Sequence, residues 1–226
     1  DANGQWVPKK NPSVTYGTNG FYLTFDGFNG STASDESGNS NDWTANNLAT
    51  TDLMLDHTQN NFATGNSTQP SSATLSEGNL RASYSYPTVT TGTFGMTSGK
   101  WYWEVDIVTS NAPRLGVWKL DGTQGTPTDL GANVNSWCIL NNPSRTYHNG
   151  STASYGSFDL GAGDVIGFAY DADTGELWVS EDGSFLGDPV AGTSPAFSSI
   201  SGTIVPAMGG GSGSMSAVYN FGQDSS

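Results

Sequence analysis

From residue 74 onward, short apolar runs alternate with turn-forming residues at intervals of roughly ten. Runs of this length fit β-strands, whereas amphipathic helices show longer periodic segments. The expected strands cover residues 79–84, 100–108, 114–119, 136–140, 165–171, 176–180, 203–208 and 217–221. Many short, evenly spaced strands predict an all-β fold, an antiparallel sandwich of two sheets.

The expected strand at 100–108 indicates how such a sheet buries one face. Apolar residues occupy every second position and therefore share a side: Trp101, Trp103, Val105 and Ile107. The positions between them face the other way: Tyr102, Glu104 and Asp106. Aromatic residues make up 12% of the chain, as much as all charged residues together. We therefore expect a core built largely from Trp, Tyr and Phe.

A hairpin near residue 170 is the clearest local signal. Apolar segments at 165–170 and 177–179 flank the sequence Asp-Ala-Asp-Thr-Gly-Glu at 171–176. The second segment is followed by Glu-Asp-Gly at 181–183. Because Asp and Gly tolerate the positive φ angles of tight turns, the pattern predicts strand, turn, strand and turn in direct succession.

The net charge of −14 argues against two classes of partner. Nucleic acids and anionic membranes attract clustered Lys and Arg, but the one adjacent basic pair here is Lys9 and Lys10. No apolar stretch approaches the roughly 20 residues of a membrane-spanning helix. We expect neither nucleic-acid binding nor membrane insertion. The single cysteine, Cys138, lies in an apolar run, so we expect a buried thiol.

The first eighty residues differ from the rest of the chain. Residues 1–19 are polar, contain Pro and lack periodicity, so we expect an extended arm. Residues 20–80 are predicted to form a leader that packs on a sandwich of residues 81–226. Trp6 and Trp43 are the expected partner-docking residues, because an exposed indole is costly. The chain begins with Asp rather than Met, so we expect a processed product or a segment of a longer protein.

Several segments match one family pattern in order: 99–105 (GKWYWEV), 115–117 (LGV), 163–168 (GDVIGF), 175–178 (GELW), 181–183 (EDG), 206–207 (PA) and 220–222 (NFG). They resemble the SPRY family of concanavalin-like β-sandwiches. The resemblance implies a jelly-roll-type sandwich that serves as a binding scaffold, with its function in the loops.

A second resemblance covers the leader. Segments at 20–26 (GFYLTFD), 35–43 (DESGNSNDW) and 60–64 (NNFAT) resemble a leader that precedes SPRY-like domains in structural proteins of tailed bacteriophages, especially tail fibres. This resemblance implies a component of a virus particle and carries most of the functional inference.

The sequence offers little catalytic chemistry. His57 and His148 are the two histidines, and neither lies in a recognised active-site motif. We expect no enzymatic activity and no cofactor. One loop has the composition of a Ca²⁺ site, with candidate ligands Asp35, Asn39, Asn41 and Asp42. The alternative, which we favour, is a loop rich in Asx turns; for residues 171–176 we likewise favour a hairpin turn over a Ca²⁺ loop.

The loops at 119–133 and 141–157 are the expected binding features. The candidate ligand-binding residues are Trp118, Asp121, Asn141, Asn142, Arg145, Tyr147 and His148. Aromatic faces beside amide and guanidinium groups suit sugar rings, which stack through C–H faces and exchange hydrogen bonds through hydroxyls. The alternative is that Tyr147 packs under its loop while the Asn residues form turns.

The resulting hypothesis is a noncatalytic bacteriophage virion protein. The favoured role is a tail-fibre or surface-appendage domain that binds host surface glycans or a neighbouring virion protein. One alternative is a capsid or tail decoration (cement) protein clamped on by its arm; another is a carbohydrate-binding module of a secreted enzyme. We expect a location on the virion surface and a homo-oligomer, a trimer by analogy with fibres, although no heptad repeat is visible.

Overall fold

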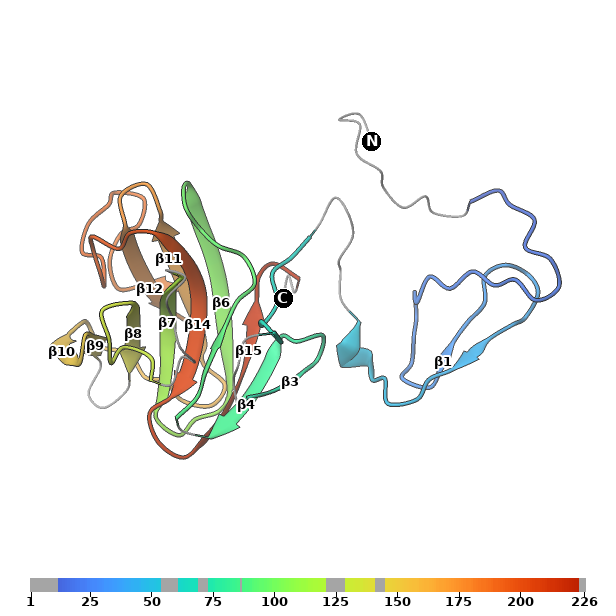
Figure 1. The fold of residues 1–226 in the computed structure, drawn as a ribbon, viewed down its shortest axis with the longest axis horizontal. Helices are drawn as coiled ribbons and strands as arrows, with labels where there is room; N and C mark the ends of the chain where they lie inside the picture. The colour runs from blue at the N-terminus through green and yellow to red at the C-terminus, as the bar shows by residue number, and fades with distance from the viewer. Residues whose placement is uncertain are drawn as a thin grey trace. The chain divides into compact units, whose positions relative to one another are not determined.

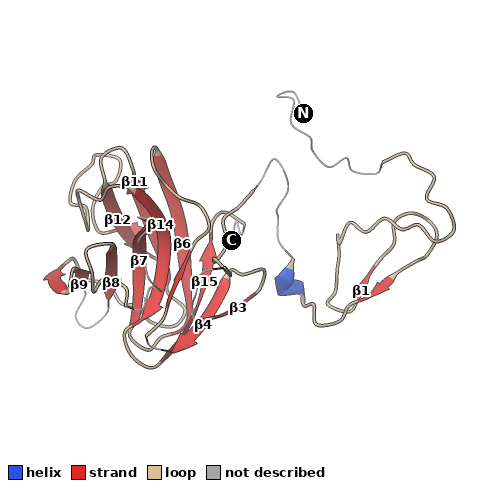
Figure 2. Cartoon of the chain, viewed as in Figure 1, coloured by secondary structure: helices blue, strands red, loops and turns tan. Residues whose placement is uncertain are grey.

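The computed structural model describes residues 12–53, 61–68, 73–85, 87–120, 129–140 and 145–223. The chain divides into two compact units, Asp1–Phe62 and Ala63–Ser226. Figure 1 follows the path of each unit, and Figure 2 shows that strands and loops make up nearly all of the described chain. Within the described ranges, no helix is long and apolar enough to cross a membrane.

The first unit contains little regular structure. Strand β1 (Thr32–Ala33) pairs antiparallel with β2 (Trp43–Thr44), and a 3₁₀ turn, η1, spans Thr50–Asp52. Its buried apolar residues in the described range are Phe28 and Ala33. The ring of Trp43 lies 4.8 Å from that of Phe21, yet 52% of Trp43 is exposed. Trp6, the other expected docking residue, lies outside the described residues.

The second unit is a sandwich of two antiparallel sheets, which confirms the predicted fold class. One sheet has the order β10-β9-β8-β7-β14-β5 and the other β13-β12-β11-β6-β15-β4-β3. The strands span β3 (Thr74–Ser76), β4 (Arg81–Ser85), β5 (Val89–Thr91), β6 (Lys100–Thr109), β7 (Pro113–Leu120), β8 (Ser136–Leu140), β9 (Arg145–His148), β10 (Ser151–Ser154), β11 (Val165–Asp171), β12 (Glu176–Glu181), β13 (Ser184–Phe185), β14 (Thr203–Gly210) and β15 (Ser214–Asn220).

The main core lies between the two sheets. Strand β6 follows the predicted alternation, because Trp103, Val105 and Ile107 are buried while Tyr102 and Asp106 are exposed. The Trp103 ring stacks on that of Phe168 in β11, with centroids 5.2 Å apart. Aromatic stacking of this kind adds to the free energy gained by burying the ring area. The main cluster nevertheless contains eleven Val, Leu and Ile residues and seven Trp, Tyr and Phe residues, so the core is not built largely from aromatic residues as expected.

A second, smaller core cluster covers the outer face of the six-stranded sheet. It consists of Val89, Trp118, Leu130, Cys138, Val205 and Ala207, with Tyr147 packed against it. Burial raises the pKa of the Cys138 thiol to about 12. The prediction of a buried, unreactive cysteine is therefore confirmed.

Two features of the sandwich differ from the sequence interpretation. Residues 145–154, placed in a loop, form the β9–β10 hairpin, whose two-residue turn has φ angles of 49° at Asn149 and 74° at Gly150. An Asn-Gly turn of this type is the strongest short-range hairpin signal. In addition, β3 pairs with β4, so part of the expected leader segment 20–80 belongs to the seven-stranded sheet.

Candidate functional site

A shallow hollow lies on the sandwich where β6, β11 and β12 run side by side. Its volume is about 50 Å³, and it is lined by Lys100, Trp101, Ala169, Tyr170, Asp171, Trp178 and Pro189. We call it the Trp101 hollow. The strand register places Lys100 opposite Asp171 and Tyr102 opposite Ala169, while Ala169 is opposite Trp178. Lys100, Tyr102, Ala169, Asp171 and Trp178 thus share the outer face of the sheet at the hollow, whereas the side chains of Trp101 and Tyr170 point to the core face.

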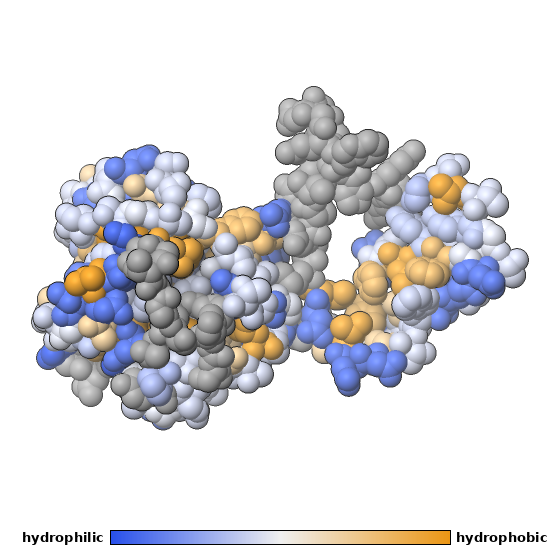
Figure 3. Space-filling model, viewed as in Figure 1, coloured by the Kyte–Doolittle hydropathy of each residue, from blue (hydrophilic) through white to orange (hydrophobic). Residues whose placement is uncertain are grey.

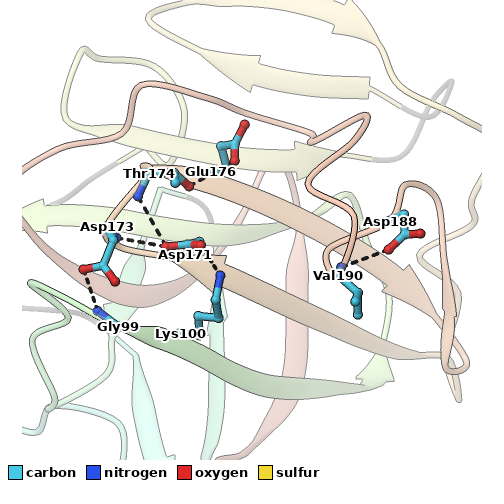
Figure 4. Close-up of polar contacts among 8 residues, drawn as sticks. All are labelled: Gly99, Lys100, Asp171, Asp173, Thr174, Glu176, Asp188 and Val190. Carbon is cyan, nitrogen blue, oxygen red and sulfur yellow. Dashed lines mark hydrogen bonds and ion pairs between the residues drawn. The ribbon is translucent and has the colours of Figure 1, made fainter.

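The rim of the hollow is fixed by the carboxylate of Asp171 (Figure 4). One of its oxygens forms an ion pair with the Lys100 ammonium group. The other accepts hydrogen bonds from the backbone N–H groups of Asp173, at 3.0 Å, and Thr174, at 3.3 Å. The bond to Lys100, joined by these backbone donors, lowers the pKa of Asp171, and the same bond raises the pKa of Lys100.

The turn at 171–176 is therefore organised around Asp171, and it joins β11 to β12 as the predicted hairpin turn. Its backbone closes through the N–H of Gly175, which donates to the Asp171 carbonyl oxygen at 2.8 Å. Asp173 reaches across to β6 and accepts a hydrogen bond from the Gly99 N–H at 3.0 Å. The rim is thus held by backbone hydrogen bonds, and its two charges are already paired with each other.

The opposite wall is formed by the loop at 187–193. The backbones of Asp188 and Thr193 exchange two hydrogen bonds of 3.0 Å. The Asp188 carboxylate accepts hydrogen bonds of 2.9 Å from the N–H groups of Val190 and Ala191 (Figure 4). This loop holds Pro189 against the hollow and leaves 97% of Val190 exposed. A well-ordered loop that displays an apolar side chain is a suitable contact surface for a partner.

The underside of the loop rests on Trp178. This side chain points to the outer face of its sheet and is nevertheless buried, with 2% exposed, while its indole N–H donates to the Thr193 carbonyl oxygen at 2.9 Å. Trp101 also borders the hollow and is 37% exposed, but its side chain points to the core-facing side of the sheet, whereas the exposed Tyr102 shares the outer face with Trp178. In the view of Figure 3 apolar surface occurs in small patches on a mostly hydrophilic exterior.

The ligand-binding residues expected from the sequence do not share one surface. Trp118 is buried, with 4% exposed, in the smaller core cluster. Tyr147 lies on the same outer face, with the Arg114 guanidinium 4.9 Å above its ring, and Arg114 is ion-paired with Asp129. Asp121, Asn141 and Asn142 lie outside the described residues. The predicted alternative was that Tyr147 packs under its loop. Tyr147 is half-buried against the smaller core cluster, but it lies in strand β9 and not in a loop.

His148 and Arg145 face different surroundings. The His148 ring stacks on Trp137 with centroids 4.7 Å apart, and its Nδ1 lies 2.8 Å from the Ser136 carbonyl oxygen. Arg145 donates to the Thr152 hydroxyl at 3.2 Å. Because His148 directly follows Tyr147 in a strand, their side chains point to opposite faces of the sheet. The structure therefore separates residues that the sequence placed in one loop.

The expected Ca²⁺ candidates form a hydrogen-bonded turn. Asp35 accepts hydrogen bonds from the backbone N–H groups of Tyr22, Ser37 and Asn41 at 2.8 to 2.9 Å, and from the Ser37 hydroxyl at 2.7 Å. Desolvation raises the pKa of the Asp35 carboxyl, but these hydrogen bonds outweigh it and hold the pKa well below its usual range. Both oxygens of Asp35 are thus occupied by donors from the protein.

The other three candidates complete the same turn. The side-chain amides of Asn39 and Asn41 both donate to the Gly20 carbonyl oxygen at 2.9 Å, while Asp42 accepts from the Asp35 N–H at 2.8 Å. In the described part of the chain, no three His, Cys, Asp or Glu side chains come together as metal ligands would.

Sequence reasoning missed the Trp101 hollow. The Asp-Pro pair at 188–189 and the Gly at 192 signal a turn, and Val190 between them signals an exposed apolar position. That this loop lies against Lys100 and Trp101 depends on the pairing of β6, β11 and β12, which no local motif specifies.

Comparisons with known proteins agree with the fold. The family model described as the SPRY domain matches residues 100–224. Among solved structures, the SPRY domain of human HERC1 aligns with a TM-score of 0.53 and 19% sequence identity, covering 67% of this chain and 94% of that one. At this identity the likeness concerns the fold alone. No curated protein matches the sequence.

Proposed function

Because the chain belongs to the SPRY domain family, we propose that its sandwich is a noncatalytic binding module whose recognition surface is the Trp101 hollow. The ligand that fits this surface best is a cell-surface glycan. The observation that carries the proposal is the exposed Tyr102, which lies on the same outer face of the sheet as a hollow whose polar rim is held by hydrogen bonds.

The size of the hollow favours a ligand that lies across the surface. Pockets that enclose small molecules usually have volumes of about 300 Å³ or more. A hollow of about 50 Å³ accepts one side chain or the edge of one sugar ring. A polysaccharide or a protein surface meets this condition, whereas an enclosed small substrate does not.

The chemistry of the lining favours a sugar. The apolar face of a pyranose stacks on an aromatic ring, and its hydroxyls exchange hydrogen bonds with charged groups. Tyr102, which is exposed on the hollow's face of β6, offers the aromatic ring, while the exposed Lys100 ammonium group offers a donor at the rim. Pro189 and Val190 extend the apolar contact beyond the hollow.

The electrostatics of the rim argue against glycoside hydrolysis at this surface. A glycosidase needs a carboxylic acid whose pKa is raised, so that it holds a proton near neutral pH. The pKa of Asp171 is lowered instead, by its bond to Lys100 and by backbone donors. Asp171 is consequently ionised at neutral pH and holds Lys100 at the rim of the hollow.

We place this module in a surface appendage of a tailed-bacteriophage particle, where it contacts a host glycan. The resemblance of the segments at 20–26, 35–43 and 60–64 to a phage leader supports this setting. Association of the full chain with purified particles, followed by mass spectrometry, tests the setting separately from ligand binding.

A glycan array of bacterial surface polysaccharides, probed with the full chain, tests the ligand. We expect Tyr102→Ala to weaken binding by about tenfold or more, as loss of a stacking aromatic does at other interfaces. The double variant Arg145→Ala and Tyr147→Ala serves as the comparison, because it removes the surface expected from the sequence. Loss of binding in the double variant alone would move the site to β9, and no binding by the native chain would overturn the glycan proposal.

A further inference from the structure

Strand β10 forms a free edge of the six-stranded sheet. Within the described residues it pairs with β9 on one side and with no strand on the other. All four residues of Ser151–Ser154 are exposed. Figure 1 shows β10 at the end of its sheet, beyond β9 and β8. Its outer backbone groups are therefore accessible to another strand.

The hairpin register identifies which groups face outward. The turn has two residues, Asn149 and Gly150, so His148 and Ser151 form the pair that closes it. In a two-residue hairpin this closing pair is hydrogen-bonded, and hydrogen-bonded pairs alternate along an antiparallel ladder. Ser151 and Ala153 consequently direct their N–H and C=O groups toward β9. Thr152 and Ser154 direct theirs away from the sheet.

The edge lacks the features that normally prevent strand pairing. Soluble proteins protect free edges with Pro, with charged side chains or with very short strands. The sequence Ser-Thr-Ala-Ser contains neither Pro nor a charge. The other outer strands differ: β13 has two residues, β3 has three, and β5 is buried at all three positions.

The charge distribution favours a second copy of the chain at this edge. The net charge of −14 makes two copies repel each other over most of their surface. Residues 130–158, which include β8, β9 and β10, contain no Asp or Glu, and Arg145 is their one Arg or Lys. The acidic residues of the Trp101 hollow and its turns lie on the other sheet. Two copies can therefore approach at β10 with little repulsion.

The strand is also complementary to itself. Antiparallel pairing around a two-fold axis at Ala153 sets Thr152 of one copy opposite Ser154 of the other, and the reverse. Both outward-facing residues then form hydrogen-bonded pairs, while the two Ala153 residues meet at the axis, where neighbouring side chains are closest. The small methyl group of Ala fits that position.

From the free edge, the charge distribution and the self-complementary register, we infer that β10 pairs with β10 of a second copy, which joins two sheets into one continuous sheet. The resulting assembly is a two-fold dimer rather than the trimer expected by analogy with fibres. Four backbone hydrogen bonds make a weak interface, so the dimer forms at high protein concentration or when copies are held together on a particle.

Sedimentation equilibrium of the full chain, between about 10 µM and about 1 mM, measures the association. We expect a monomer–dimer equilibrium. Hydrogen exchange provides a residue-specific readout, because the amides of Thr152 and Ser154 gain protection as the concentration rises, while those of Ser151 and Ala153 are protected by β9 at every concentration.

Three variants test whether the edge of β10 is responsible for the association of two copies. Thr152→Pro removes one outward N–H, and Ala153→Glu places two like charges at the axis, so each should weaken association by about tenfold or more. Thr152→Val is the matched control, because it loses the hydroxyl that Arg145 contacts but keeps the backbone N–H; it should associate like the native chain. A native chain that stays monomeric at about 1 mM, or association unchanged in both Thr152→Pro and Ala153→Glu, would overturn the inference.

Discussion

The indole N–H of Trp178 donates a hydrogen bond of 2.9 Å to the carbonyl oxygen of Thr193. This bond joins strand β12 to the loop that carries Pro189 and Val190. Because Trp178 is buried on the outer face of its sheet, the loop and the strand hold each other in place. The wall of the Trp101 hollow therefore depends on a buried residue that also lines the hollow.

Substitution of Trp178 by Phe tests how much its hydrogen bond contributes to stability, apart from the packing of its aromatic ring. Trp178→Phe keeps an aromatic ring but loses the N–H donor, and it should cost about 1 kcal/mol more in unfolding free energy than Trp118→Phe. Trp118 is a suitable control because it is also buried and its Nε1 has no hydrogen-bond partner among the described residues. Urea unfolding of both variants measures the difference. Equal losses of stability would mean that the bond to Thr193 contributes nothing.

The ion pair at the rim predicts a pH dependence of stability. The pKa of Asp171 is lower in the folded chain than its ordinary value of about 3.9. Its contribution to stability is therefore complete above that value and is lost as the pH falls through the lower folded pKa. We expect Asp171→Asn to be less stable than the native chain at pH 7, with the difference shrinking below about pH 4.

Chemical denaturation at pH 7 and pH 3 measures this change, with Asp173→Asn as the control. Asp173 accepts one hydrogen bond, from the Gly99 N–H, and forms no ion pair with Lys100. Its replacement should have the smaller effect. A stability difference for Asp171→Asn that stays constant across the range would contradict the assigned role.

Gly175 is required where β11 turns into β12. Its φ angle is +72°, and a Cβ atom there would lie 2.2 Å from the Ile200 carbonyl oxygen. Gly175→Ala should therefore cost about 2 to 4 kcal/mol, because backbone strain and a steric clash combine. Gly183→Ala is the matched control, since Gly183 has a φ of +78° but open space around its Cβ position. Thermal unfolding should show a loss of about 1 kcal/mol for the control; similar losses for both variants would contradict the clash.

The hydrogen bonds of Asp35 lead to a prediction about amide hydrogen exchange in the first unit. Asp35→Ala removes the acceptor of four hydrogen bonds, so the amides of residues 37 and 41 should exchange at least about tenfold faster. Ser31→Ala is a control in the same unit outside this turn. Because both carboxylate oxygens already accept protein donors, we expect added Ca²⁺ to leave the exchange of these amides unchanged. Protection that rises with Ca²⁺ and disappears in Asp35→Ala would support the metal-binding alternative instead.

The sequence predicted the strands that carry strong local signals. The alternation in β6 and the turns at 171–176 and 181–183, on either side of β12, were confirmed, because each depends on residues next to one another in the chain. The β9–β10 hairpin was missed although Asn149 and Gly150 form a recognisable turn. Its short strands carry polar and aromatic residues that are also typical of a binding loop. The prediction of a loop at these residues was therefore wrong.

The amino-acid sequence alone established on which side of a sheet a residue lies, because that side follows from the alternation of apolar and polar residues along the strand. It assigned Trp101 and Trp103 to the same face, yet 37% of Trp101 is exposed and 2% of Trp103. The difference arises because burial depends on what the opposite sheet and its loops cover, and Trp101 lies near the end of β6, beside the hollow. The approach of Lys100 to Asp171, and of Pro189 to both, likewise results from strand pairing over long sequence separations. The tertiary structure alone decides such contacts, since they depend on the register of whole strands and not on neighbouring residues.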